Sequence, residues 1–257
     1  MPTALITGAS GGIGYELARL FAKDRHNLVL VARSASRLTE VASELEREFH
    51  VSAKIIPLDL AAAPAPQFVF DQLQRENIRV DFLGNNAGYG IRGEFAEVAL
   101  EQSLGQIQLN ITALTALTRL FLPAMIERRS GRILNVASTA GFQPGPLMAV
   151  YYATKAYVIS FSEALAEELK NTGISVTCLC PGVTDTGFQK RAATANSILF
   201  KSLKPMDPGT VAMDGYRAMM SGKTMAIAGF RNWLVAESVR FAPRKWVTAI
   251  SRRLLEE

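Results

Sequence analysis

Short apolar runs alternate with longer amphipathic stretches along almost the whole chain. The apolar runs are near-continuous, which is typical of strands that are covered on both faces of a parallel sheet. Regular alternation of strand and helix predicts one doubly wound α/β domain, with helices on both faces of a mainly parallel, seven-stranded sheet. The expected strands are 4–7, 28–32, 53–57, 80–83, 133–137, 176–179 and 224–228, and the expected helices lie near 13–25, 35–49, 66–77, 96–127, 151–171 and 208–221.

The end of the chain differs from the rest. We expect residues 1–230 to form the α/β domain and residues 231–257 to be a basic, amphipathic extension of it. Within the extension, Trp246, Val247, Ile250 and Leu254 recur at helical spacing among basic residues. This terminal helix could cover a substrate cleft, pad a subunit contact, or lie on a membrane surface, in that order of preference.

Composition limits the classes of function. A hydrophobic fraction of 49% and a charged fraction of 20% are those of an ordinary globular domain. The net charge of +5 is a mild excess, better explained by a solvated basic terminus than by nucleic-acid binding. No apolar run reaches the roughly 20 residues that cross a bilayer. The first strand is expected to start at Thr3, which leaves no room for a signal peptide.

The chain contains two cysteines, Cys178 and Cys180, in one strand-like run. They do not form a CxxC pair, and no other cysteine completes a metal site or a disulfide framework. We expect no metal. The two side chains are expected to be small core residues of a cytoplasmic protein, where thiols stay reduced.

A glycine-rich turn, Thr7-Gly8-Ala9-Ser10-Gly11-Gly12-Ile13-Gly14, follows the first expected strand directly. Glycine allows a tight turn and lets the backbone approach a phosphate closely. A helix that begins at this point offers free N–H groups and a partial positive charge to an anion. The turn therefore predicts a pyrophosphate site, with a ligand-free strand-to-helix turn as the alternative.

The end of the second expected strand bears on which dinucleotide is bound. An acidic residue about 20 positions beyond the glycines would bind the ribose 2′-hydroxyl of NAD. Here the strand ends on Arg33, with Ser34 and Arg37 close by as helpers. A guanidinium suits a 2′-phosphate dianion, so these residues favour NADP(H). The alternative is that Arg33 is only a solvated charge at the end of a strand.

Tyr151 and Lys155 are four residues apart and therefore share one face of an expected helix. An ammonium in that position favours the phenolate, so we expect it to lower the pKa of Tyr151 from its ordinary value of about 10. Tyr152 does not have this spacing to Lys155. Ser138 precedes the pair, at the end of the fifth expected strand, where its hydroxyl could donate to a carbonyl oxygen.

Together these motifs resemble the short-chain dehydrogenase/reductase family in its single-domain form, a Rossmann fold. The resemblance runs from residue 3 to about residue 230. It rests on TGASGGIG at 7–14, Asp59, Asn85-Asn86-Ala87-Gly88, Asn110, Ser138, Tyr151 with Lys155, and Pro181-Gly182 followed by Thr186.

The resemblance implies a set of cofactor contacts. Asp59 would accept from the adenine amino group, Lys155 would hold the nicotinamide ribose, and Thr186 would meet the carboxamide. The full expected cofactor set is Gly8, Ser10, Gly12, Ile13, Gly14, Arg33, Ser34, Arg37, Asp59, Leu60, Asn86, Ala87, Gly88, Tyr151, Lys155, Pro181, Gly182, Val183 and Thr186.

The resemblance also implies an activity. It points to an NADP(H)-dependent oxidoreductase that reversibly reduces a ketone, an aldehyde or a 3-oxoacyl group to an alcohol. Tyr151 would exchange the proton, Ser138 and Lys155 would assist, and Asn110 would complete a proton relay; a polar residue that merely bends its helix is the alternative for Asn110. A catalytically silent NADP(H)-binding regulatory protein is the rival class, and retention of all four residues argues against it.

Three segments, 89–95, 139–150 and 184–206, are expected to line the substrate site. Their apolar side chains favour a small-molecule substrate with an apolar body. The third segment looks like a mobile lid, with a flap packed on the domain as the alternative. Relatives commonly assemble through the helices expected at 96–127 and 151–171, so we expect a homodimer or homotetramer, with at most weak membrane contact through the terminal helix.

Overall fold

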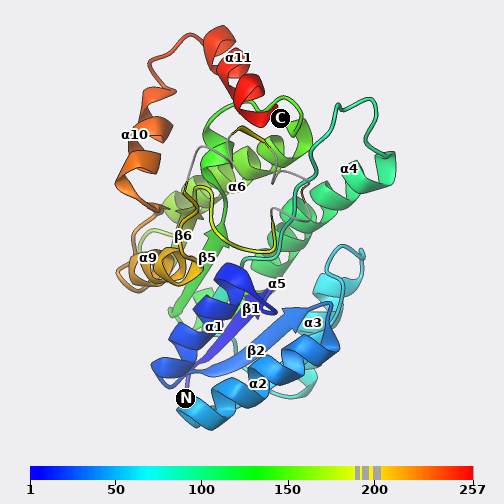
Figure 1. Cartoon of the computed structure of the whole chain (residues 1–257). Helices are drawn as coiled ribbons and strands as arrows, with labels where there is room; N and C mark the ends of the chain where they lie inside the picture. The colour runs from blue at the N-terminus through cyan, green and yellow to red at the C-terminus, as the bar shows by residue number, and fades with distance from the viewer. Residues whose placement is uncertain (189–191, 193–196, 199–203, 257) are drawn as a thin grey trace.

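The computed structural model shows one α/β domain in three layers, a sheet between two sets of helices (Figure 1). The structure describes residues 1–188, 192, 197–198 and 204–256. Its strands are β1 (Thr3–Thr7), β2 (Asn27–Ala32), β3 (Ala53–Pro57), β4 (Phe82–Asn85), β5 (Gly131–Val136), β6 (Ile174–Cys180) and β7 (Met225–Ile227). Its helices are α1 (Gly12–Lys23), α2 (Ala35–Phe49), α3 (Ala65–Arg75), α4 (Leu100–Ile107), η1 (Gln108–Ala113), α5 (Leu114–Glu127), η2 (Thr139–Phe142), α6 (Ala149–Glu168), α9 (Pro208–Met220), α10 (Phe230–Ser238) and α11 (Arg244–Leu255).

The seven strands form one parallel sheet in the order β3-β2-β1-β4-β5-β6-β7. This confirms the doubly wound α/β fold expected from the alternating pattern. The strand order reverses between β1 and β4, and ligands of such sheets bind outside the carboxyl ends of the strands at that point. β4 begins two residues later than expected, at Phe82. Asp81, directly before it, accepts a hydrogen bond from the Thr3 N–H on Oδ2 at 2.9 Å.

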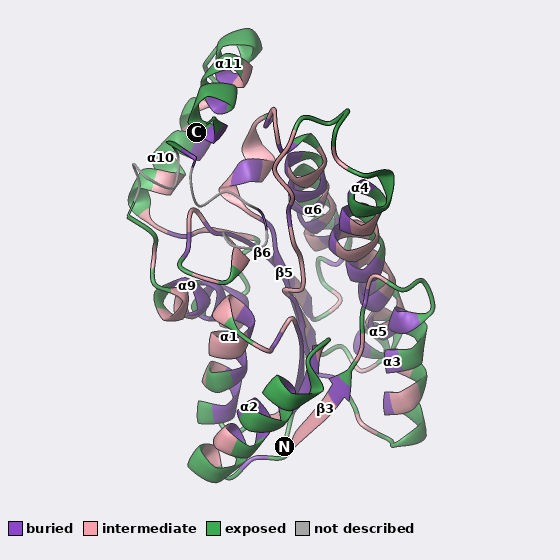
Figure 2. Ribbon diagram, turned by 45° about the vertical axis from the view of Figure 1, so that its right-hand side comes forward, coloured by how far each residue is buried: buried purple, intermediate pink, exposed green. Residues whose placement is uncertain are grey.

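Helices cover both faces of the sheet, so the five inner strands are mostly buried on both sides, while the edge strands β3 and β7 are largely half-buried (Figure 2). On one face α1, α2 and α9 pack over side chains such as Ile6, and on the other α3 and α5 pack over side chains such as Leu5. Successive residues of a strand point to opposite faces, which is why both must be apolar. Cys178 and Cys180 lie in this core as free thiols, as expected.

The long helix expected at 96–127 is not one regular helix. α4 and α5 are joined by the π-helical turn η1, which contains Asn110. Taken as one helical segment, Leu100–Glu127 is by length and composition long and apolar enough to cross a membrane. This corrects the expectation that no apolar stretch of the chain is long enough, and among the described residues no other helix meets the same criterion. Its contacts with α3 and α6 account for its apolar face.

The C-terminal extension forms two helices, α10 and α11, where the sequence predicted one. Gly229, with φ of +85°, adopts the left-handed backbone at which α10 begins, and Pro243 precedes α11. The inner face of α11 buries Val247, Ser251 and Leu255 at four-residue spacing. Both helices stand at the end of the molecule opposite α2 (Figure 1).

Candidate active site

A cavity of about 1020 Å³ extends from the glycine-rich turn to α10 and α11. It lies at the carboxyl ends of the strands, where sheets of this kind bind their ligands. Every cofactor residue expected from the sequence lines it except Gly14 and Arg37, and of the four expected catalytic residues only Asn110 lies outside. The lining residues from that set are Gly8, Ser10, Gly12, Ile13, Arg33, Ser34, Asp59, Leu60, Asn86, Ala87, Gly88, Ser138, Tyr151, Lys155, Pro181, Gly182, Val183 and Thr186.

The glycine-rich turn forms a cradle between β1 and α1. Gly8 and Gly12 adopt positive φ values of +68° and +55°, which side chains disfavour. No side chain caps the first turn of α1, and the turn contains no acidic residue. Gly14 supports the cradle from behind: a Cβ there would collide with the Gly8 carbonyl and with Asn86. Asn86 fixes the turn to β4 by donating from Nδ2 to the Thr7 carbonyl at 2.8 Å. These groups fit a pyrophosphate.

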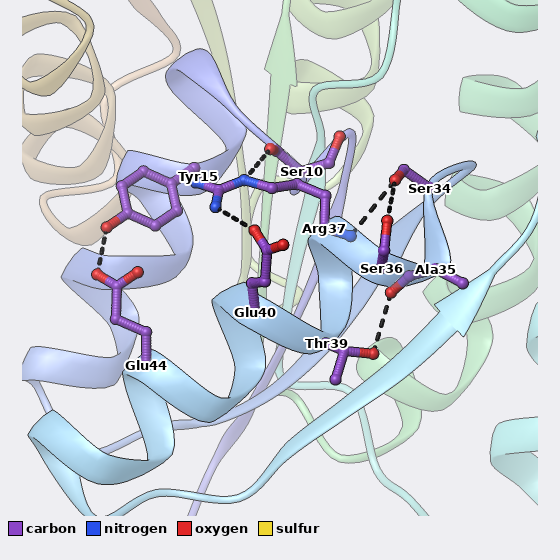
Figure 3. Close-up of polar contacts among 9 residues, drawn as sticks. All are labelled: Ser10, Tyr15, Ser34, Ala35, Ser36, Arg37, Thr39, Glu40 and Glu44. Carbon is purple, nitrogen blue, oxygen red and sulfur yellow. Dashed lines mark hydrogen bonds and ion pairs between the residues drawn. The ribbon is translucent and has the colours of Figure 1, made fainter.

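The two arginines expected at the 2′-phosphate differ in their surroundings. Arg37 lies outside the cavity, where its Nε donates to the Ser10 carbonyl at 3.3 Å and its Nη1 pairs with Glu40 at 2.7 Å (Figure 3). Its guanidinium also lies 5.9 Å from the ring centroid of Tyr15. Arg37 thus tethers the glycine-rich turn to α2, and its contact with the cofactor stays a prediction.

Arg33, in contrast, lines the cavity and is exposed. Among the described residues it makes no hydrogen bond and no ion pair. Ser34 beside it lines the cavity too, and its Oγ accepts from the Arg37 N–H at 3.3 Å as the N-cap of α2. The structure therefore offers one unpaired guanidinium to a phosphate at the end of β2.

Asp59 and Leu60 line the cavity where the expected adenine would lie. Asp59 Oδ1 accepts from the Ala61 N–H at 3.0 Å, while Oδ2 has no hydrogen-bond partner among the described residues. Such an oxygen suits an amino group as donor. Pro181, Gly182, Val183 and Thr186 line the opposite stretch of the cavity.

Tyr151 and Lys155 meet in the middle of the cavity, both on α6. Lys155 is buried, and its Nζ donates to the Val136 carbonyl at 2.8 Å and lies 5.8 Å from the ring centroid of Tyr151. Ser138 Oγ accepts from the Ala140 N–H at 3.1 Å and donates to the Pro181 carbonyl at 3.4 Å. Three side chains from β5 and α6 thus gather around one point.

The pKa values of this pair are governed by burial. Burial lowers the pKa of Lys155 to about 8. Burial raises the pKa of Tyr151, and a hydrogen bond with Ser138 acts in the opposite direction. The expected lowering of the tyrosine pKa is therefore wrong for the protein alone, because loss of hydration outweighs the hydrogen bond with Ser138. Tyr151 is held as a protonated phenol.

Asn110 supports the site from the π-helical turn η1. Its Oδ1 accepts from the Tyr89 N–H at 3.1 Å, and its Nδ2 donates to the Tyr89 carbonyl at 2.8 Å and to Thr154 Oγ1 at 3.0 Å. Thr154 in turn donates to the Tyr151 carbonyl at 2.7 Å. Asn110 therefore both interrupts the regular helix, as one alternative proposed, and links that helix to the backbone of Tyr151. π-Helical turns are frequent at functional sites.

Beyond Tyr151 the cavity becomes mostly apolar. Phe188 packs against Tyr151 with ring centroids 5.2 Å apart, and Met148 lines the same region. The wall opposite comes from α10, α11 and the loop between them: Val235, Val239, Ala242, Val247, Ile250, Leu254 and Leu255. Covering the substrate cleft was the first of the three roles considered for the terminal helix; the structure places α11 along the cavity, and the role itself stays a prediction. Of the expected lid 184–206, Leu199, Phe200 and Leu203 lie outside the described residues.

The sequence did not single out three polar residues of this apolar region. Tyr152 lines it and shares a hydrogen bond with Ser251 of α11. Gln143 lines it as well, and its Oε1 is buried without a hydrogen-bond partner. Tyr152 follows Tyr151 in the sequence and Gln143 lies in an expected substrate segment, but Ser251 is brought to this region only by the position of α11.

Two contacts hold α11 across the cavity. Arg252 Nη2 pairs with Glu94 at 2.6 Å, and Arg92 Nε donates to the Leu255 carbonyl at 2.7 Å. Glu94 and Arg92 belong to the expected substrate segment 89–95. The end of the chain is therefore joined to a loop that precedes it by more than half the sequence.

The model of the short chain dehydrogenase family matches residues 2–197. The chain belongs to this family of oxidoreductases, which use a nicotinamide cofactor and act on CH–OH and C=O groups.

Known members of the family resemble the chain over most of its length. A short-chain dehydrogenase from Sphingobium yanoikuyae, solved in complex with NADPH, superposes with a TM-score of 0.84 at 34% identity, covering 94% of each chain. Ketoacyl reductase HetN from Nostoc sp. is 39% identical over 187 residues, which are 72% of this chain and 65% of HetN. The bovine very-long-chain 3-oxoacyl-CoA reductase is 35% identical over 73% of this chain and 61% of its own length. The match thus spans less than two thirds of either reductase.

Proposed function

We propose that this protein is an NADPH-dependent reductase of a carbonyl group carried on an apolar body, and that it also works in reverse as an alcohol dehydrogenase. One observation carries the proposal: a continuous cavity joins the glycine cradle and Arg33 to Ser138, Tyr151 and Lys155, and then to an apolar region. The preference for NADPH rests on Arg33, the unpaired guanidinium at the end of β2. The NADPH bound by the Sphingobium relative supports it.

When bound, the cofactor supplies a hydride to the carbonyl carbon. Tyr151 donates its proton to the carbonyl oxygen, and the Ser138 hydroxyl donates a hydrogen bond to the same oxygen. The raised pKa of Tyr151 keeps the phenol protonated, which is the form that reduction needs. Lys155, with a pKa lowered to about 8, is suited to return a proton to the tyrosine near neutral pH.

Asn110 positions the backbone of Tyr151 through its hydrogen bond to Thr154, which in turn donates to the Tyr151 carbonyl. We propose that it also completes the path by which protons reach Lys155. Gly88 lies between the two: a Cβ there would be 3.0 Å from Asn110 Oδ1 and 3.5 Å from Lys155 Nζ. The absence of a side chain at Gly88 keeps that approach open.

The substrate class that the apolar region supports best is a 3-oxoacyl thioester. Its acyl chain would lie along the apolar wall of α10 and α11, with the reacting carbonyl at Tyr151. The printed activities of HetN and of the bovine relative, both reductases of oxoacyl groups, support this choice. A compact alicyclic ketone or an aldehyde would use only part of the apolar region.

The test is turnover of a panel of 3-oxoacyl thioesters, ketones and aldehydes with NADPH, run in both directions. Tyr151→Phe should keep NADPH binding and lose at least about a hundredfold in turnover, the contribution of one positioned acid. Tyr157→Phe is the matched control, because Tyr157 lies on the same helix but bonds Thr115 outside the cavity. Turnover retained by Tyr151→Phe would refute the mechanism. NADPH binding without turnover of any compound would favour the rival, a silent regulatory protein.

We also propose that the protein is a cytoplasmic homodimer or homotetramer. The exposed side chains of Leu100, Leu104 and Ile107 on α4 support assembly through α4, α5 and α6, and the two free buried thiols suit a reducing compartment. Light scattering of the purified chain measures the assembly directly.

A further inference from the structure

The helices α10 and α11 present two different faces. One face lines the cavity with Val239, Val247 and Leu255. The other, with the loop that joins the helices, carries large apolar side chains in solvent, among them Phe241 of the loop at 86% and Trp246 of α11 at 67% exposure. Large exposed aromatic side chains that gather on one surface mark a site of interaction. The exposed apolar residues of the pair are Phe230, Trp233, Leu234, Val235, Phe241, Trp246, Ile250 and Leu254.

The same helices carry an excess of positive charge. Residues 230–256 contain two acidic residues, Glu237 and Glu256, and these pair with Arg240 and Arg252. The remaining cations are exposed and form no ion pair with a described residue. They are Arg231, Arg244, Lys245 and Arg253.

We propose that this α10–α11 face docks the protein on the surface of an anionic lipid bilayer. Amphipathic helices with aromatic residues on one side and Lys or Arg around them bind in the plane of the membrane interface. Aromatic rings favour the headgroup level, and each nearby cation adds attraction to anionic lipid. Phe230 and Trp233 are already stacked, with ring centroids 5.7 Å apart, so this part of the face needs little rearrangement.

Charge favours lipid over a second copy of this chain as the occupant. In a two-fold contact the same patch meets itself, so Arg244 and Lys245 would approach the cations of the other copy. Such a contact would place like charges together around an apolar centre, which is unfavourable. A lipid surface instead supplies negative charge and an apolar interior side by side.

The position of the face gives the docking a consequence for the cavity. Val235, Ile250 and Leu254 both line the cavity and are exposed, so the apolar end of the cavity lies beside the proposed lipid contact. Both helices stand at one end of the molecule (Figures 1 and 2). A protein docked in this way would take an apolar ligand directly from the bilayer.

Tryptophan fluorescence tests the docking, because Trp233 and Trp246 are the only two tryptophans of the chain. The full-length protein is mixed with vesicles of phosphatidylcholine, alone or together with phosphatidylglycerol. We expect a blue shift of the emission and quenching by brominated lipid only when phosphatidylglycerol is present. Added salt should reverse both effects, since it screens the charges. An unchanged spectrum with both kinds of vesicle overturns the proposal.

Charge reversal identifies the surface. Arg244→Glu with Lys245→Glu should weaken vesicle binding by about tenfold or more. The matched control, Lys23→Glu with Arg47→Glu, makes the same change in net charge at the ends of α1 and α2 and should bind as the wild type does. Equal vesicle binding by the two double variants overturns the proposal. The proposal also fails if the wild-type protein gains mass in solution as its concentration rises and Arg244→Glu with Lys245→Glu abolishes that gain, because the face would then bind a second copy of the chain. Vesicle binding is measured without substrate turnover. A failure of the docking proposal therefore does not count against the proposed reduction, which the turnover panel decides.

Discussion

The sharpest prediction concerns Arg33, the one expected phosphate ligand that the structure leaves unpaired. Arg33→Ala should weaken NADPH binding and leave NADH binding unchanged, because only NADPH carries the 2′-phosphate. A hydrogen bond to a charged group contributes about 1.5–3 kcal/mol. Arg33 is exposed, so solvent screens the interaction and the lower end applies. A loss of about 1.4 kcal/mol corresponds to about a tenfold rise in the Kd for NADPH.

Arg37→Ala is the matched comparison, because Arg37 is the neighbouring arginine but lies outside the cavity. Removing it frees the Ser10 carbonyl and the Glu40 carboxylate, and so loosens the glycine-rich turn. The pyrophosphate common to both cofactors rests on that turn. Both Kd values should therefore rise by a similar factor, below about fivefold for exposed contacts of this kind.

The assay is the Kd of each cofactor for the wild type and the two variants, followed by nicotinamide fluorescence at several salt concentrations. The selectivity lost in Arg33→Ala should shrink as salt rises, since the phosphate interaction is screened. Two results would refute the reasoning: an equal loss for NADH and NADPH in Arg33→Ala, or a loss confined to NADPH in Arg37→Ala.

Three further predictions follow from burial and contacts. A Lys155 pKa of about 8 in the folded state, against 10.5 unfolded, means that the charged form destabilises the fold below pH 8. The free energy of unfolding should therefore rise by about 2 kcal/mol from pH 7.5 to 9.5, a slope absent in Lys155→Met when urea denaturation is compared at both pH values. Gly14→Ala should cost about 1–3 kcal/mol in urea unfolding and impair cofactor binding, because its Cβ would strike the Gly8 carbonyl. Gly11→Ala, whose Cβ would meet no protein atom within 4 Å, should leave urea unfolding unchanged; an equal loss of stability in both variants would disprove the packing role of Gly14. Arg252→Ala should raise KM for long apolar substrates by no more than about fivefold, with kcat nearly unchanged, since its pair with Glu94 is exposed and screened by solvent.

The fold could be predicted because its signals are local. Continuous apolar runs such as 28–32 are needed only where helices cover both faces of a strand, so they specify the parallel sheet. The interruption at η1 could not be predicted in the same way. It depends on Asn110 finding Tyr89 and Thr154, which come from other parts of the chain.

The candidate site likewise has features that local sequence predicts and features that depend on distant contacts. Its glycines and the Tyr151–Lys155 spacing could be recognised, because turn geometry and helical periodicity act over a few residues. The roles of Arg33 and Arg37 could not be separated, since both are arginines within four residues of each other, where β2 passes into α2. Only the positions of Ser10 and Glu40 show that Arg37 is already engaged.

The C-terminal region shows how little composition says about orientation. The sequence indicated a basic amphipathic helix with three alternative roles. The structure turns one side of α11 to the cavity and leaves Trp246 exposed. The contacts that accompany this orientation come from distant parts of the chain, such as the pair between Arg252 and Glu94, which are 158 residues apart.

By itself, the sequence determined the order of strands and helices, the phosphate-binding turn and the chemical groups of the site, because each depends on neighbours within a turn or a strand. Tertiary structure alone decided the protonation of Tyr151, the free state of Arg33 and the walls of the apolar cavity. Those properties depend on which distant segments remove water from a group or pair with it. A pKa and an ion pair belong to the surroundings of a residue, and folding creates those surroundings.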